Sequence, residues 1–229
     1  MIINNELTPV GDWWFEFNDE RFTRFKDHSQ IYDFLLECQV TAEILAQAEL
    51  LFVDRLLYTG WMKFNSNIDE EPHKICKKDA GQIFASYLQP SRLADICFKD
   101  IDKTEPFVYP LDINFYGWGI IIDESGDKRK TPSLMRMETV PIGFASIDIL
   151  TQSDVWLPYD LYGKPQPKLH ELNAPRLQKA LTKVKEALSI EPIIDDNELA
   201  ELHEDFTITN ITDIEGDILI YDPRSQRVV

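Results

Sequence analysis

The chain has 229 residues, of which 23 are basic and 40 are acidic, so its formal net charge at pH 7 is −17. This length fits one large domain or two small ones, and it suffices for a hydrophobic core without metal or disulfide support. A field of this sign repels nucleic acid phosphates and anionic membranes, and it attracts basic proteins. We therefore expect neither a nucleic acid nor a membrane as partner, although acidity also serves solubility alone.

The cysteines and the first residues of the chain favour a reducing compartment. Three cysteines are an odd, small number that gives no disulfide framework. The first residues lack the basic and apolar regions of a signal peptide, and no apolar run reaches the roughly 20 residues that span a bilayer. We expect a cytoplasmic protein of bacterial type.

The first third of the chain begins with a strand pattern and continues with helical patterns. Residues 13–18 alternate apolar and mixed positions, which is the period of a strand with one strongly apolar face. Apolar residues then recur at helical spacing from 31 to 56, which predicts one long helix, or two helices broken near 39–41, with Gly60 as the stop. Residues 79–88 predict a further helix that ends before Pro90.

The middle of the chain, residues 106–150, predicts β-structure. It is rich in aromatic and β-branched residues, and residues 123–127 have the composition of a turn. Further strands are predicted at 134–140 and 142–150. Pro110 and Pro141 would place their strands at an edge or at a break. An antiparallel meander is the simplest arrangement.

The last third begins with a long connection, residues 154–175, that contains four prolines. Asn173 is a favourable N-cap for an amphipathic helix at 174–188. The positions predicted to be buried on that helix are Leu177, Leu181, Val184 and Leu188. Asn197 is predicted to cap a short helix at 198–206, and two final strands follow.

These patterns predict an α+β fold with a central antiparallel β-meander packed against several α-helices. We expect one domain over residues 1–229. A possible subdivision separates a mainly helical part at 1–105 from a β-rich part at 106–229, which includes the helix at 174–188.

Charge is segregated within the last third of the chain. Residues 164–186 contain six basic side chains and two acidic ones, whereas residues 191–222 contain eleven acids and no lysine or arginine. Exposed ion pairs between these segments would contribute about 0–1 kcal/mol each and would leave several acids over. We interpret the acidic segment as a docking surface. Its candidate residues are Asp195, Asp196, Glu198, Glu201, Glu204, Asp205, Asp213, Glu215 and Asp217.

Trp14 is a candidate aromatic anchor for the same surface. It lies between the apolar positions of the 13–18 strand pattern and would point away from the buried face. Exposed tryptophan often anchors an interface. The alternative is that both faces of the strand are covered, which would bury Trp14.

Catalytic motifs are absent from the sequence. It contains no phosphate loop, nucleophile elbow or zinc motif, and we expect no cofactor and no bound metal. Residues 213–217 carry carboxylates but lack the spacing of a calcium-binding loop, so we interpret them as a turn. His170, Glu171 and Asp160 lie in or near the proline-rich connection and could supply a general base, but no nucleophile accompanies them.

The leading functional hypothesis is an acidic cytosolic binding protein that neutralises a basic protein partner. Its specific form is an immunity protein that inhibits a bacterial toxin by occluding the toxin's active site, because carboxylates can replace substrate phosphates there. The alternative is a hydrolase of unknown class that uses carboxylates near the 154–175 connection. A third possibility is a regulatory subunit that is acidic for solubility only.

Overall fold

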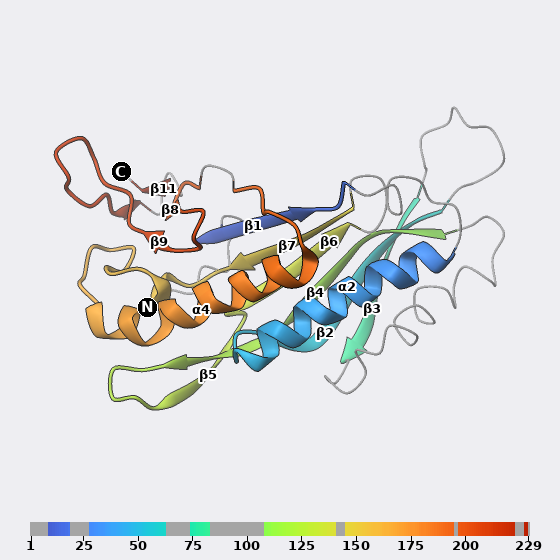
Figure 1. Ribbon diagram of the computed structural model, residues 1–229, viewed down its shortest axis with the longest axis horizontal. Coiled ribbons are helices and arrows are strands. Elements are labelled where there is room, and N and C mark those ends of the chain that lie inside the picture. The colour runs from blue at the N-terminus through green and yellow to red at the C-terminus, as the bar shows by residue number, and fades with distance from the viewer. Residues whose placement is uncertain are drawn as a thin grey trace.

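The computed structural model describes residues 9–18, 28–62, 74–82, 108–140, 145–194, 197–222 and 227–228. The described elements form one large antiparallel β-sheet with two α-helices over one face (Figure 1). The predicted mixture of α and β structure and the antiparallel sheet are confirmed. The described residues contain two α-helices, so the expectation of several is not confirmed there.

The large sheet has the strand order β1-β7-β6-β4-β2-β3, and β5 pairs with the end of β4. Its strands are β1 (Gly11–Glu16), β2 (Phe52–Met62), β3 (Lys74–Gln82), β4 (Val108–Ile122), β5 (Lys128–Pro132), β6 (Met135–Val140) and β7 (Ser146–Thr151). The arrangement is more than a meander, because β1 pairs with β7 and so joins the N-terminal part of the chain to a strand more than 130 residues later. Such non-local pairing cannot be read from strand patterns alone.

β4 organises the sheet, because it pairs with β2 along one edge and with β6 and β5 along the other. Pro110 lies opposite Gly60, where the register between β2 and β4 shifts, so the predicted break at Pro110 is confirmed. A Cβ atom at Gly119 would lie 2.3 Å from the carbonyl oxygen of Leu50. Glycine is therefore required where β4 passes the end of the first helix.

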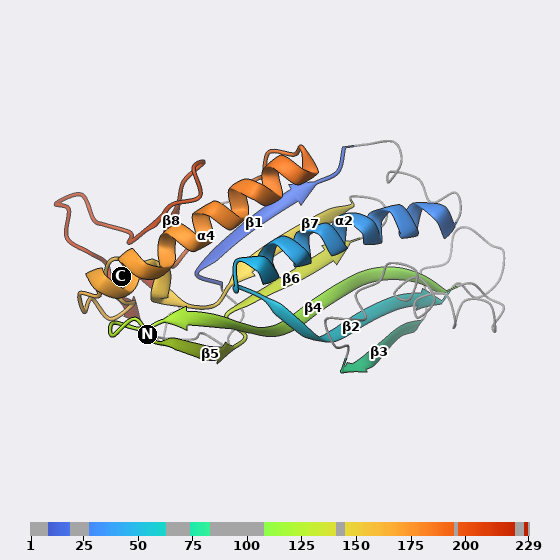
Figure 2. The ribbon, with the colours of Figure 1, turned by 60° about the horizontal axis from the view of Figure 1, so that its bottom comes forward.

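The helices α2 (His28–Gln47) and α4 (Pro167–Leu188) lie side by side on the same face of the sheet (Figures 1 and 2). Burial alternates along β1 and β6, so every second side chain points toward the helices. This one-sided cover leaves the outward side chains of these strands half-buried. Prominent members of the core are Trp13, Phe15, Phe34, Leu35, Leu45, Phe115, Met137, Ile149, Leu177, Leu181 and Val184. Neither described helix is long and apolar enough to cross a bilayer.

α4 begins at Pro167, about two turns before the predicted start, and Asn173 is not its N-cap. Proline fits the first turn of a helix because the N–H that it lacks has no partner there. Asn173 is fully buried, and its amide donates to the carbonyl of Ile122 at 2.7 Å and accepts from the N–H of Ile122 at 2.9 Å. The predicted burial of the helix's four apolar positions is confirmed.

The described residues of the 1–105 segment form three strands and one helix, and the subdivision into a mainly helical part and a β-rich part stays a prediction. α2 ends at Gln47, Glu49 takes a left-handed φ of 60°, and β2 starts at Phe52, where helix was predicted to continue. Residues 79–82 belong to β3 and not to a helix. The remainder of the predicted 79–88 helix lies outside the described residues.

The C-terminal segment folds as part of the molecule. The predicted helix at 198–206 is wrong, because these residues contribute to a hairpin of β8 (Glu201–Leu202) and β9 (Ile208–Thr209). The short strands β10 (Tyr221–Asp222) and β11 (Arg227–Val228) pair farther along, and the 3-10 helix η2 (Asp154–Trp156) precedes α4. Leu199, Phe206 and Ile208 are buried in the common core.

Candidate functional site: the acidic end

Four five-residue turns of one architecture carry much of the exposed charge. They span residues 123–127, 160–164, 203–207 and 213–217. In each turn the first N–H donates to the fifth carbonyl, and the fourth N–H donates to the first carbonyl. The fourth residue has a φ between 67° and 91°, which glycine adopts without strain. Three of the four turns have glycine there, and Phe206 is the exception.

An aspartate side chain holds each turn together. In three turns the first residue is Asp, and its Oδ1 accepts the N–H groups of the third and fifth residues. In the turn at 203–207, Asp205 accepts from the N–H and the hydroxyl of Thr207, and these bonds lower the pKa of Asp205. The predicted turns at 123–127 and 213–217 are confirmed. The shared D-x-x-G pattern was the available sequence signal for the turn at 160–164.

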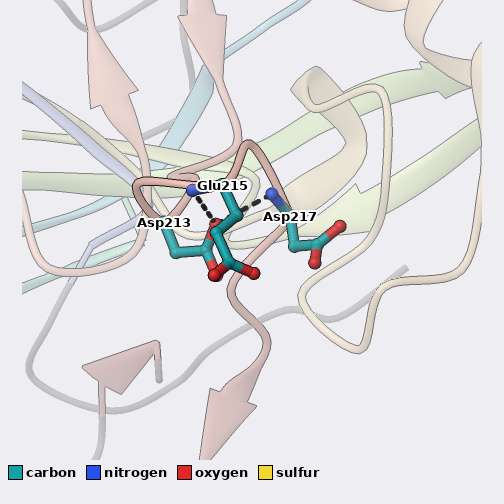
Figure 3. Close-up of side chains that lie close together, drawn as sticks. All are labelled: Asp213, Glu215 and Asp217. Carbon is teal, nitrogen blue, oxygen red and sulfur yellow. Dashed lines mark hydrogen bonds between the residues drawn. The ribbon is translucent and has the colours of Figure 1, made fainter.

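The turn at 213–217 brings three carboxylates together (Figure 3). Oxygen atoms of Asp213, Glu215 and Asp217 lie within 4.8 Å of one another, and all three side chains are exposed. Asp213 is occupied by backbone N–H groups of the turn, at 2.8 and 3.0 Å. The side chains of Glu215 and Asp217 accept none of these turn hydrogen bonds, so all of their oxygens are available to an external partner.

All seven described carboxylates of the predicted docking surface are exposed. They are Glu198, Glu201, Glu204, Asp205, Asp213, Glu215 and Asp217. None of them forms an ion pair with a described residue. Asp195 and Asp196 lie outside the described residues. We call the turns 203–207 and 213–217, together with Glu198 and Glu201, the acidic end.

The basic face of α4 leaves the acidic end largely unneutralised. Within the part of the chain that the structure describes, one ion pair joins the helix to the acidic segment, between Lys185 Nζ and Glu191 at 2.6 Å. A neutral hydrogen bond also joins them, because the Gln178 amide donates to the backbone carbonyl of Asp205 at 3.0 Å. Within the described residues, the basic side chains of α4 therefore neutralise one carboxylate of the acidic segment, Glu191.

Exposed apolar side chains accompany the acidic end. Ile214 stands fully exposed within the turn at 213–217, and Tyr162 is 57% exposed in the turn at 160–164. The segment that follows the turn at 213–217 lies beside the turn at 160–164, because the N–H of Tyr221 donates to the carbonyl of Leu161 at 2.6 Å. Exposed apolar and aromatic groups beside charge are typical of protein interfaces. Tyr162 is the candidate anchor that the sequence reading missed.

Trp14 does not lie among the acidic turns. It points away from the helices, as predicted, and is half-buried on the outward face of the sheet. Its indole Nε1 is buried without a hydrogen-bond partner, and its backbone exchanges two hydrogen bonds with Ile193. The role of Trp14 as a partner anchor stays a prediction.

A second group of carboxylates lies on that outward face. Asp148 of β7 stands directly between Trp14 of β1 and Glu138 of β6 in the strand register. Its half-buried environment, with Asp12 and then Glu138 as negative neighbours, raises the pKa of Asp148 to about 7. Glu138 also forms an ion pair with Arg136 at 2.9 Å. The predicted strand at 142–150 placed Asp148 between apolar neighbours, but its partners on other strands could not be read from the sequence.

The carboxylates of the 154–175 connection serve the fold. Asp154 is fully buried, and Asp160 accepts the N–H groups of Tyr162 and Lys164 within its own turn. His170 and Glu171 belong to the first turns of α4 and line a pocket that does not include Asp160. Burial lowers the pKa of His170, so its imidazole is neutral at pH 7.

The chain matches no protein-family model, no curated protein and no solved structure. Its function is therefore argued from the geometry of its own surface. Two features distinguish that surface. They are the exposed, unneutralised carboxylates of the acidic end and the carboxylate group around Asp148.

Proposed function

We propose that this protein binds a basic protein through its acidic end and thereby neutralises it. The observation that supports this proposal is that the seven described carboxylates of the predicted docking surface are exposed and form no ion pair with a described residue. If basic side chains of the protein itself neutralised these carboxylates, their electrostatic attraction for a partner would be weak. Here the charge is displayed on turns at one end of the molecule (Figure 1).

The specific form of the proposal is an immunity protein that inhibits a bacterial toxin in the cytoplasm by occluding its active site. A toxin that acts on nucleic acid must present a basic cleft to phosphates, and carboxylates on rigid turns can occupy the phosphate positions. The exposed Ile214 and Tyr162 supply the apolar contacts that charge alone does not provide.

Charge reversal tests this proposal at residues that do not hold the turns. The triple variant Glu198→Lys, Glu204→Lys and Glu215→Lys changes carboxylates whose oxygens accept no hydrogen bond from a described residue. We expect its association with the partner to slow by about tenfold or more at low salt, because steering of the encounter is lost. The wild-type rate should fall steeply as the screening length shortens from about 30 Å at 0.01 M to about 3 Å at 1 M salt. Stopped-flow fluorescence measures both rates.

Glu43→Lys is the matched control. Glu43 is an exposed acid of α2, and this helix lies away from the turns of the acidic end (Figure 1). Its reversal should leave the association rate nearly unchanged. Equal rates for the wild type and the triple variant at low salt would contradict the proposal.

A hydrolase is the second candidate, and the raised pKa of Asp148 is the observation that favours it. Strongly perturbed carboxyl groups occur preferentially at catalytic sites. The candidate carboxylates of this second proposal are Asp12, Glu138 and Asp148, on the outward face of the sheet. A hydrolase would show turnover that disappears in Asp148→Asn. Full activity in that variant would exclude this site.

A further inference from the structure

A pocket opens between α4 and the β8–β9 hairpin, beside the turn at 203–207. Its volume is about 300 Å³. Ligand pockets span about 300–1,000 Å³, so this one suits a single side chain better than a cofactor. Because the turn at 203–207 belongs to the acidic end, a partner seated there would also cover this pocket.

The floor of the pocket is apolar. Trp156, Leu177, Phe206 and Ile208 line it and are at most 4% exposed. The indole Nε1 of Trp156 already donates to the hydroxyl of Thr151 at 2.6 Å, so it presents no free donor. The floor can therefore accept the methylene groups of a long side chain.

The rim of the pocket consists of hydrogen-bond acceptors. Glu171 is exposed and forms no ion pair with a described residue. The amide group of Gln178 donates to the carbonyl of Asp205, which leaves its oxygen as an acceptor. Neutral His170 offers an acceptor nitrogen and no positive charge that would repel a cation. The ionised carboxylate of Asp205 adds to the negative potential nearby.

We propose that this pocket receives an arginine side chain of the basic partner, with its methylene stem on the apolar floor and its guanidinium group at the rim. The inference rests on the proposed function and names the residue type that the partner inserts. Guanidinium carries five N–H donors and no acceptor, and it is more weakly hydrated than an ammonium group. These properties match an acceptor-lined rim above an apolar floor.

The first test uses N-acetyl-arginine amide as the probe and N-acetyl-citrulline amide as its uncharged counterpart. Both are titrated into the full-length, ¹⁵N-labelled protein. With the arginine probe we expect saturable chemical-shift changes at the backbone amides of Ala174, Gln178 and Thr207. The citrulline probe should bind at least about tenfold more weakly, because it cannot form charge-assisted hydrogen bonds. The pKa of His170 should fall further when the guanidinium binds beside it, and its ring proton shifts report this.

Two variants separate the pocket from general attraction to acidic residues. Glu171→Gln removes the rim charge, and Ala174→Trp fills the pocket without changing charge. Each variant should bind the arginine probe about tenfold more weakly than the wild type, with an unchanged circular dichroism spectrum. Glu186→Gln, an exposed acid near the other end of α4, is the matched control and should have no effect.

The outcomes distinguish this inference from the proposed function. Chemical-shift changes that the arginine probe causes only in the turns at 203–207 and 213–217 would contradict arginine binding in the pocket. Equal changes with the citrulline probe would contradict it too. Neither result would bear against the proposed function of the acidic end. A partner that binds Ala174→Trp as tightly as wild type would contradict arginine binding in the pocket as well. If the charge reversals fail while the arginine probe still binds in the pocket, the proposed function fails and the arginine site stands.

Discussion

Asp148 is a carboxyl group whose pKa the fold raises strongly, to about 7. It is half-buried on the outward face of the sheet, and its Oδ1 has no hydrogen-bond partner. Desolvation is the main cause that raises its pKa from 3.8 to about 7, and Asp12 and Glu138 add repulsion. The hydroxyl of Ser146 acts in the opposite direction. The folded protein therefore holds a proton on Asp148 that the unfolded chain releases.

This proton makes stability depend on pH in a defined direction. Between pH 4 and 7 the folded state binds more protons at Asp148 than the unfolded state does. The contribution of Asp148 to stability is therefore fully present below the pKa of the unfolded chain, 3.8. It is lost as the pH rises through the pKa of the folded protein, about 7. Asp148→Asn keeps the neutral form at every pH. We expect the variant to match wild type near pH 4 and to exceed its unfolding free energy near pH 8 by on the order of 1–2 kcal/mol, after allowance for partial solvent exposure.

Urea unfolding at both pH values measures this difference. Asp54→Asn replaces an exposed carboxylate of β2 and serves as the control, with the same small effect at both pH values. An Asp148→Asn variant that is no more stable than wild type at pH 8 would show that the carboxylate is not destabilised by its surroundings.

At the scale of elements, a buried polar clamp fixes α4 to the sheet and to the end of α2. Asn173 pairs with both backbone groups of Ile122. Arg176, one turn later, donates to the carbonyls of Ile120 and Ala48 at 2.9 Å. These bonds satisfy backbone groups where β4 and α2 end, which apolar packing could not do.

Truncating the clamp should destabilise the fold. Asn173→Ala leaves the backbone groups of Ile122 without their partners, and we expect the free energy of unfolding to fall by about 1–3 kcal/mol. Lys183→Ala, at an exposed position of the same helix, should change it by less than about 0.5 kcal/mol. Thermal unfolding followed by circular dichroism measures both. A loss at Asn173 no larger than at Lys183 would contradict the clamp.

The same elements show what the sequence can predict. The strands between 108 and 151 were predicted because β-branched and aromatic residues and turn composition agree there. The predicted helix extends wrongly into β2 because Leu51, Phe52 and Leu56 continue the helical spacing of α2. The β2 strand lies between two other strands, and its pairing leaves no local signal in the sequence. The stop at Glu49 has no glycine to mark it. Asn173 was misread because its partner, Ile122, is 51 residues away.

The candidate site was predictable to a similar degree. The surplus of acids and two of the turns were evident from composition and local pattern. The neighbourhood of Tyr162, Ile214 and the pocket at His170 was not, because it depends on the docking of residues 197–222 against α4 and the 158–164 segment. Long-range contacts of this kind leave no local periodicity in the sequence.

The acidic end gives the molecule a negatively charged side that could orient it toward a basic partner. The acidic turns lie at one end of the sheet, whereas α2 covers its other part (Figures 1 and 2). The gathering of exposed carboxylates at the acidic end favours oriented encounters with a basic surface. A uniform distribution would serve solubility without orienting a partner.

The most direct measurement is a pull-down from the native cell at low and at high salt with the tagged wild type and with the Glu198→Lys, Glu204→Lys, Glu215→Lys variant, followed by mass spectrometry of the bound proteins. We predict that the wild type retains one basic protein at low salt and releases it more readily at high salt. The variant should fail to retain that protein. The role of the acidic end would be contradicted if both forms recovered the same proteins at both salt concentrations. It would also be contradicted if neither form recovered any protein.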